Sequence, residues 1–206
     1  MEIDFKFGKL IVDPDIYYRI VRDKNLVPRP YHKYKSLKGL AFLYRLLSCR
    51  IGNDSKYTFA RMLMRPERNE VVDHINRNPL DNRRSNLRIV SPRQNSLNRM
   101  PNSSTGFIGV STLMMRGKKR VCATFQTISK RMKFSIYDSP DGRIICAIVH
   151  DKYVIDAGDD EFAPLNFPIL RNEPQRTKLM QMNVSEFRQN TLENLAEKLC
   201  IVSFVG

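Results

Sequence analysis

The chain has 206 residues, of which 42% are hydrophobic and 27% are charged, and its formal net charge is +14. This apolar content supports real cores in one large domain or two small ones, while no apolar run is long enough to span a bilayer. The positive charge favours a phosphate backbone as partner, with a solvated or membrane-surface protein as the alternative.

The cysteines are far apart in the sequence. They lack the paired spacing of a zinc site, so we expect no structural zinc. Scattered cysteines without an apolar signal peptide fit a reducing compartment, and we expect an intracellular protein in the cytoplasm or nucleoid of a host cell. The residues are Cys49, Cys122, Cys146 and Cys200.

The N-terminal part alternates short elements with basic and aromatic residues. Residues 5–12 predict a strand, and Asp13, Pro14 and Asp15 open a turn or a short helix through Ile20. Residues 28–35 are basic, aromatic and punctuated by proline, which fits either a DNA-facing segment or an exposed linker. The apolar stretch at residues 39–47 is expected in the core, and residues 59–64 predict a helix.

A compact strand, loop, strand and helix unit follows. Residues 71–75 and 87–90 are apolar strand candidates, and the segment between them is rich in turn residues. The helix start has three signals: Ser91 as N-cap, Pro92 at the first position and Gln94 where a capping box needs its acceptor.

This unit resembles the HNH endonuclease family, which builds its site on a ββα-metal core. The resemblance implies that Asp73 and Asn95 hold one divalent cation, that His74 takes a proton from the attacking water, and that Asn86 holds the loop. Hard oxygen ligands suit Mg²⁺ or Mn²⁺, and imidazole is a competent general base near neutral pH. Taken singly, these residues fit a strand end and turn positions better than they fit a catalytic site. Their ordered combination before a capped helix favours a nuclease.

The C-terminal half predicts a small sheet and a long helix. Residues 107–111, 121–127 and 133–137 are strand candidates, and a helix begins after Ser139 and runs roughly to Ala157. The part resembles the ethylene-response-factor type of DNA-binding domain through residues 104–110 and 162–168.

A sheet of this type places outward side chains in the major groove and lysines on phosphate. Residues 101–134 contain no acid, whereas acids outnumber bases after residue 157. Each candidate alone fits a phosphate contact or a solvated charge better than a base reader. The candidates for DNA binding are Arg116, Lys118, Lys119, Arg120, Gln126, Lys130, Arg131 and Lys133.

The last forty residues lie outside both resemblances. Residues 171–178 look like a linker, and Asn183 to Glu186 has capping-box spacing. Val184, Phe187, Leu195 and Leu199 would share one face of a helix that docks on the core or pairs two chains.

Together these features predict an α+β protein: a ββα-metal HNH core with a β-rich N-terminal extension, then a three-stranded sheet with a helix. The predicted divisions are residues 1–100, 101–168 and 169–206. The predicted function is a monomeric, magnesium- or manganese-dependent homing endonuclease from a phage or mobile element that nicks double-stranded DNA without a membrane partner. The alternatives are a non-catalytic DNA-binding regulator with a decayed HNH fold and, less favoured, an RNA-binding protein.

Overall fold

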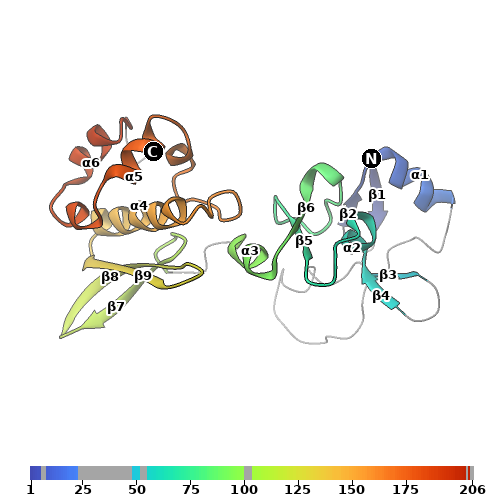
Figure 1. Cartoon of the computed structure of the whole chain (residues 1–206), viewed down its shortest axis with the longest axis horizontal. Coiled ribbons are helices and arrows are strands. Elements are labelled where there is room, and N and C mark those ends of the chain that lie inside the picture. Colours follow the sequence, from blue (N-terminus) through green and yellow to red (C-terminus); the bar gives the residue numbers. More distant parts are fainter. Residues whose placement is uncertain (6–7, 23–47, 52–54, 100–103, 203, 205–206) are drawn as a thin grey trace. The chain divides into compact units, whose positions relative to one another are not determined.

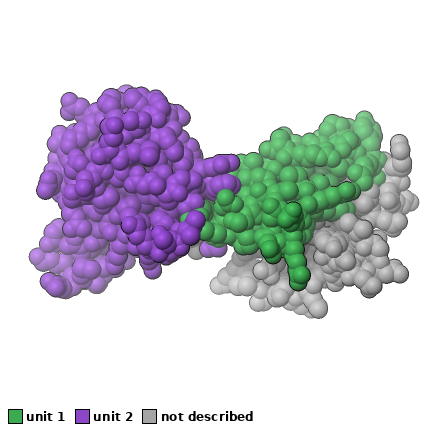
Figure 2. Space-filling view, in the orientation of Figure 1, with its two compact units in different colours: residues 1–98 green, residues 99–206 purple. Residues whose placement is uncertain are grey.

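The structure is a computed structural model, and it describes residues 1–5, 8–22, 48–51, 55–99, 104–202 and 204. It is an α+β protein with small antiparallel sheets (Figure 1). The chain divides into two compact units, Met1–Asn98 and Arg99–Gly206, which are coloured separately in Figure 2. The predictions for residues 28–35 and 39–47 lie outside the described residues.

The first unit begins with a hairpin, not the single strand predicted for residues 5–12. Ile3 pairs with Leu10 and Phe5 with Gly8, so the apolar alternation belongs to two strands that turn back on each other. Leu10, Val12 and Ile16 are buried with Phe59 in one core cluster. The elements are β1 (Glu2–Phe5), β2 (Gly8–Ile11), α1 (Pro14–Arg22), β3 (Ser48–Ile51), β4 (Ser55–Thr58) and α2 (Phe59–Met64).

The segment that carries the HNH resemblance forms the expected strand, loop, strand and helix. β5 (Val71–His74) pairs antiparallel with β6 (Leu87–Val90), and a 3-10 turn, η3 (Arg84–Asn86), precedes β6. The predicted capping box is present at the start of α3 (Pro92–Leu97). The Gln94 backbone N–H donates to Ser91 Oγ at 3.2 Å, and the Ser91 N–H donates to Gln94 Oε1 at 2.9 Å.

The second unit is a three-stranded antiparallel sheet with α4 packed on one face (Figure 1). The helix predicted after Ser139 is confirmed, because the Ser139 side chain caps it at Gly142. The first strand starts three residues later than predicted, because Gly109 has φ +68°, which is outside the extended region of a strand. Gly109 also lies so close to His150 that a Cβ would collide with the ring. The elements are β7 (Val110–Met115), β8 (Lys118–Gln126), β9 (Arg131–Tyr137) and α4 (Pro140–Asp156).

The segment after the sheet corrects two predictions. Residues 171–178 are not a linker, because a helix forms there and buries Leu179 completely. The single helix expected to carry Phe187 and Leu195 is two shorter ones, separated where Thr191 caps the second. The elements are η4 (Pro168–Arg171), α5 (Gln175–Gln181), η5 (Val184–Arg188) and α6 (Leu192–Lys198). Within the described ranges, no helix combines the length and apolar character that a membrane crossing requires.

Candidate active site and basic sheet face

The β5–β6 register determines which residues lie opposite Asp73 and His74. His74 lies opposite Leu87, and Asp73 lies opposite Arg88. Asp73 is buried, and its Oδ2 accepts hydrogen bonds from Arg88 Nε at 2.9 Å and from Asn98 Nδ2 at 3.1 Å. The Arg88 Nη2 atom is 2.8 Å from the same oxygen. A buried charge is stable only when it is paired in this way.

The other carboxylate oxygen of Asp73 is less crowded. Among the described contacts, Oδ1 accepts one hydrogen bond, from Asn98 Nδ2 at 3.0 Å. The Asn98 amide also donates to the His74 carbonyl at 2.9 Å, so the residue after α3 ties the helix to the end of β5. Asn95 precedes Asn98 by three positions and lies near the same side of the helix turn. Its side chain is exposed and makes no hydrogen bond within the described part of the chain.

The His74 ring is half-buried at the end of β5. Its Nε2 atom is 3.3 Å from Oδ1 of Asn82. Burial lowers the pKa of His74 from its ordinary value of 6.5, and the hydrogen bond with Asn82 opposes that shift. The imidazole is therefore favoured in its neutral form, which is the form that can accept a proton.

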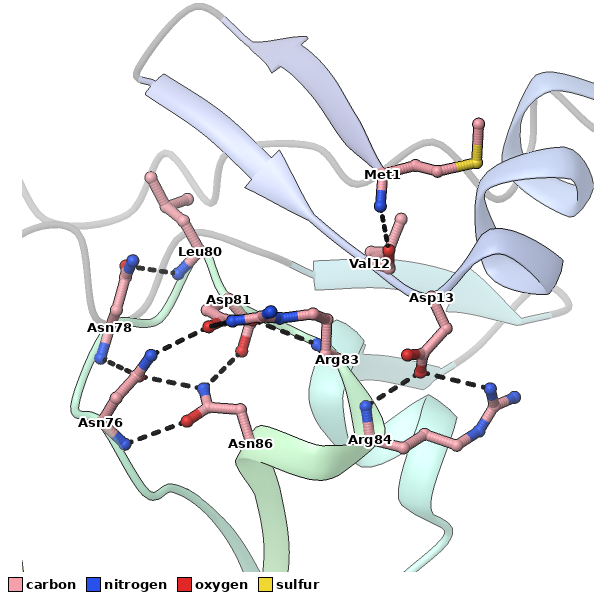
Figure 3. Close-up of polar contacts among 10 residues, drawn as sticks. All are labelled: Met1, Val12, Asp13, Asn76, Asn78, Leu80, Asp81, Arg83, Arg84 and Asn86. Carbon is pink, nitrogen blue, oxygen red and sulfur yellow. Dashed lines mark hydrogen bonds and ion pairs between the residues drawn. The ribbon is translucent and has the colours of Figure 1, made fainter.

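Asn86 binds the loop between the two strands. Its Oδ1 accepts from the Asn76 backbone N–H at 3.0 Å, and its Nδ2 donates to Asn76 Oδ1 at 2.9 Å and to the Asp81 carbonyl at 2.7 Å. Asn76 Nδ2 donates in turn to Asp81 Oδ2 at 2.9 Å (Figure 3). Asn86 is buried, so these contacts replace the water it has lost. The loop is thus held by side chains along its length.

The N-terminal hairpin supports the same loop from outside. The Ile11 N–H donates to the Leu80 carbonyl at 2.8 Å, and the Asn82 N–H donates to the Ile11 carbonyl at 2.8 Å. The Asp13 carboxylate accepts from the backbone N–H of Arg84 at 2.9 Å (Figure 3). Residues 80–84 are therefore fixed at both ends by β2 and the start of α1.

Asp73 and Asn95, the two predicted ligands, offer a carboxylate oxygen and an amide oxygen, which are the kinds of donor that a hard divalent cation prefers. The carboxylate oxygen Oδ1 of Asp73 keeps a free lone pair among its described contacts, and the Asn95 amide is unengaged in the described part of the chain. No group of three or more His, Cys, Asp or Glu side chains suited to a metal occurs among the described residues. Asp73 and Asn95 do not make up such a group, because only Asp73 is one of these four residue types.

The sheet of the second unit has an apolar face and a basic face. Directly paired residues of antiparallel strands project to the same side, and side chains alternate along each strand. Val121 pairs with Ile136, Ala123 with Phe134 and Phe125 with Met132, and the Phe125 ring contacts His150 of α4. The opposite face, here called the basic sheet face, carries Lys118, Arg120, Gln126, Arg131, Lys133 and Tyr137.

The eight predicted DNA contacts do not all lie on that face. Arg116 and Lys130 lie in the turns between the strands. Lys119 projects to the apolar side, where its ammonium lies 3.0 Å from Asp138. Arg120 donates to the Ser135 carbonyl at 3.0 Å and stacks over Tyr137, with 4.9 Å between the guanidinium carbon and the ring centroid. The exposed cations of the face are therefore Lys118, Arg131 and Lys133.

Three residues of the candidate active site were not predicted from the sequence. Arg88 contacts Asp73 only because of the strand register, Asn98 reaches it from beyond the helix end, and Asn82 meets His74 across the loop. The spacing of three residues from Asn95, which places both asparagines on one side of a helix, was the one sequence signal that could have indicated Asn98. For Asn82, no sequence signal distinguished it from the neighbouring turn residues.

Comparison with known proteins supports the same segment. Residues 65–97 match the family model of the HNH endonucleases. No curated protein and no solved structure matches the chain. The match supports a nuclease of the phosphodiester-hydrolysing kind, and it ends before the sheet of the second unit begins.

Proposed function

We propose that the protein is a metal-dependent HNH endonuclease of homing type that hydrolyses a phosphodiester bond of duplex DNA. The observation that carries the proposal is the adjacency of Asp73 and His74 at the end of β5, within the segment matched by the HNH endonuclease model. The loop held by Asn86 and the capped helix α3 surround that pair.

Each residue has a separate task in the proposed reaction. His74, neutral and half-buried, takes the proton of the attacking water. Asn86 keeps the loop in place, and Asp73 with Asn95 would hold Mg²⁺ or Mn²⁺. When bound, such a cation polarises the scissile phosphate and stabilises the leaving oxygen.

Targeting is assigned to the second unit. The basic sheet face offers exposed cations to phosphate and alternate side chains to base edges. We propose that residues 101–168 position the cutting unit, residues 1–100. One HNH core supplies one active site, so a monomer would nick one strand. An enzyme of this kind would be encoded by a phage or mobile element and would act inside the host cell.

The decisive experiment compares the parent with His74→Ala on supercoiled plasmid that carries the DNA flanking the protein's own gene. We expect nicking in Mg²⁺, none in EDTA, and a loss on the order of 100-fold or more in the variant. Binding to the same DNA should be nearly unchanged, because a general base acts in the transition state.

The same assay separates the parts of the proposal. Binding without nicking by the folded parent in Mg²⁺ or Mn²⁺ would contradict an enzyme and indicate a DNA-binding regulator. Equal nicking of unrelated plasmid would contradict the homing type alone. Nicking that persists in EDTA would exclude the divalent cation.

A further inference from the structure

The amide of Asn82 has a defined orientation beside His74. Its Nδ2 donates to the Pro79 carbonyl at 2.9 Å, which only an N–H group can do. The amide oxygen is therefore the atom that faces His74 Nε2 at 3.3 Å. Reversing the amide would place two acceptors against each other at Pro79.

Asn82 is also held so that it cannot turn away. It is 1% exposed, and its backbone N–H donates to the Ile11 carbonyl at 2.8 Å. On its N-terminal side, Leu80 accepts from the Ile11 N–H at 2.8 Å. Strand β2 thus fixes the backbone, and Pro79 fixes the side chain.

An amide oxygen accepts hydrogen bonds and never donates them, so a neutral His74 must carry its hydrogen on Nε2. We infer that Asn82 is a positioning residue that holds His74 in the Nε2–H tautomer and aims the lone pair of Nδ1 at the attacking water. Among the described contacts of the ring, none reaches Nδ1. The inference rests on the proposed function, because it names a helper of the proposed base.

The first test needs no variant. Nitrogen-15 NMR of the full chain, at a pH where the ring is neutral, reports which ring nitrogen carries hydrogen. The sequence has three histidines, so His74 is assigned from the signal that disappears in His74→Ala. We expect a His74 Nε2–H proton protected from exchange with water. A predominant Nδ1–H tautomer, or an Nε2–H proton that exchanges freely, would overturn the inference.

The second test separates positioning from simple support of the loop. Asn82→Leu and Asn82→Asp both lose the bond to the Pro79 carbonyl, but the aspartate keeps an oxygen facing Nε2. We expect Asn82→Leu to lose the protected proton and to lower kcat on the order of 10- to 100-fold, with unchanged DNA affinity. Asn82→Asp should keep the proton and most of the rate.

A role limited to loop support predicts that both variants are equally impaired, and that result would overturn the inference. Asn76→Ala is the matched control, because Asn76 bonds within the same loop to Asp81 and Asn86. It should leave the His74 proton in place. If the parent fails to nick DNA in any metal, the proposed function fails, whereas the NMR arm still decides whether Asn82 fixes the tautomer.

Discussion

At the scale of the residue, Arg88 would compete with the proposed cation for the Asp73 carboxylate. Among the described contacts, Arg88 reaches Oδ2 alone, whereas the Asn98 amide donates to both oxygens, so Oδ1 has fewer donors and more room for a further partner. The positive charge of Arg88 repels any cation at that partner position. Arg88 would therefore stabilise the fold and weaken the proposed metal binding through the same contact.

This conflict predicts a change in metal response when Arg88 is replaced by Met. The variant leaves a buried carboxylate without its counter-charge, so we expect the free energy of unfolding to fall by about 3 kcal/mol. Mg²⁺ should restore part of it, because a ligand of the folded state stabilises by mass action. Thermal unfolding should therefore show a larger Mg²⁺-induced rise in Tm for Arg88→Met than for the parent.

Arg88→Met combined with Asp73→Asn serves as the control, and its Tm should be insensitive to Mg²⁺. Equal responses of parent, single variant and double variant would show that the cation binds elsewhere.

The prediction of these residues from sequence had a physical limit. Asp73, His74 and Asn86 were selected through the resemblance to the HNH endonucleases, and the Asn86 side chain bonds to the loop between β5 and β6. Arg88 contacts Asp73 because of the strand register, and Asn82 contacts His74 because the loop folds back on the strand end. The position of Asn82 also depends on its contact with β2, about seventy residues earlier in the chain, which no local pattern encodes.

At the scale of the element, the start of α1 also stabilises the loop that leads to β6. Asp13 directly precedes the helix, but its carboxylate accepts from the Arg84 backbone N–H and guanidinium. Asp15, two residues later, pairs with the Arg84 guanidinium. The two acids therefore touch the same residue in different ways.

We expect Asp13→Ala to lower the free energy of unfolding by about 1 kcal/mol, because it removes the partner of a backbone N–H. Asp15→Ala should have no measurable effect, since an exposed ion pair contributes little. Urea unfolding of the two variants in parallel measures the difference. A loss at Asp15 as large as that at Asp13 would mean that the charges, and not the backbone contact, hold the elements together.

Elements with strong local signals were predictable, and elements defined by distant partners were not. Ser91 and Ser139 cap their helices as their sequences indicate, because capping is decided within four residues. The prediction of one strand over residues 5–12 was wrong, since alternation alone does not reveal that β1 and β2 are two strands paired antiparallel. Helix α5 was mistaken for a linker because its burial of Leu179 depends on α4.

At the scale of the whole molecule, the proposed site and the basic sheet face belong to different units. Asp73, His74 and Asn95 lie within Met1–Asn98, whereas the exposed cations Lys118, Arg131 and Lys133 lie within Arg99–Gly206. Chemistry and affinity should therefore respond to different substitutions.

The strand register supplies a matched pair for testing this separation. Lys133 projects from the basic sheet face, while Lys119 projects from the other face and is paired with Asp138. Each Lys→Gln change removes one positive charge, so net charge is the same in the two variants. If the basic sheet face contacts phosphate, Lys133→Gln should weaken DNA binding and reduce the slope of log affinity against log salt by about one. Lys119→Gln should leave the slope unchanged.

The combined variant Lys118→Gln, Arg131→Gln and Lys133→Gln should reduce that slope by about three, while turnover at saturating DNA changes far less. We expect little change in turnover because none of these side chains is assigned to the reacting phosphate. Affinity measured across a salt series, with nicking rates at saturation, tests both statements. Equal slopes for Lys133→Gln and Lys119→Gln would mean that only total charge matters. An unchanged slope in the combined variant would mean that this face does not contact DNA. The targeting role would then be assigned to the basic aromatic segment at residues 28–35.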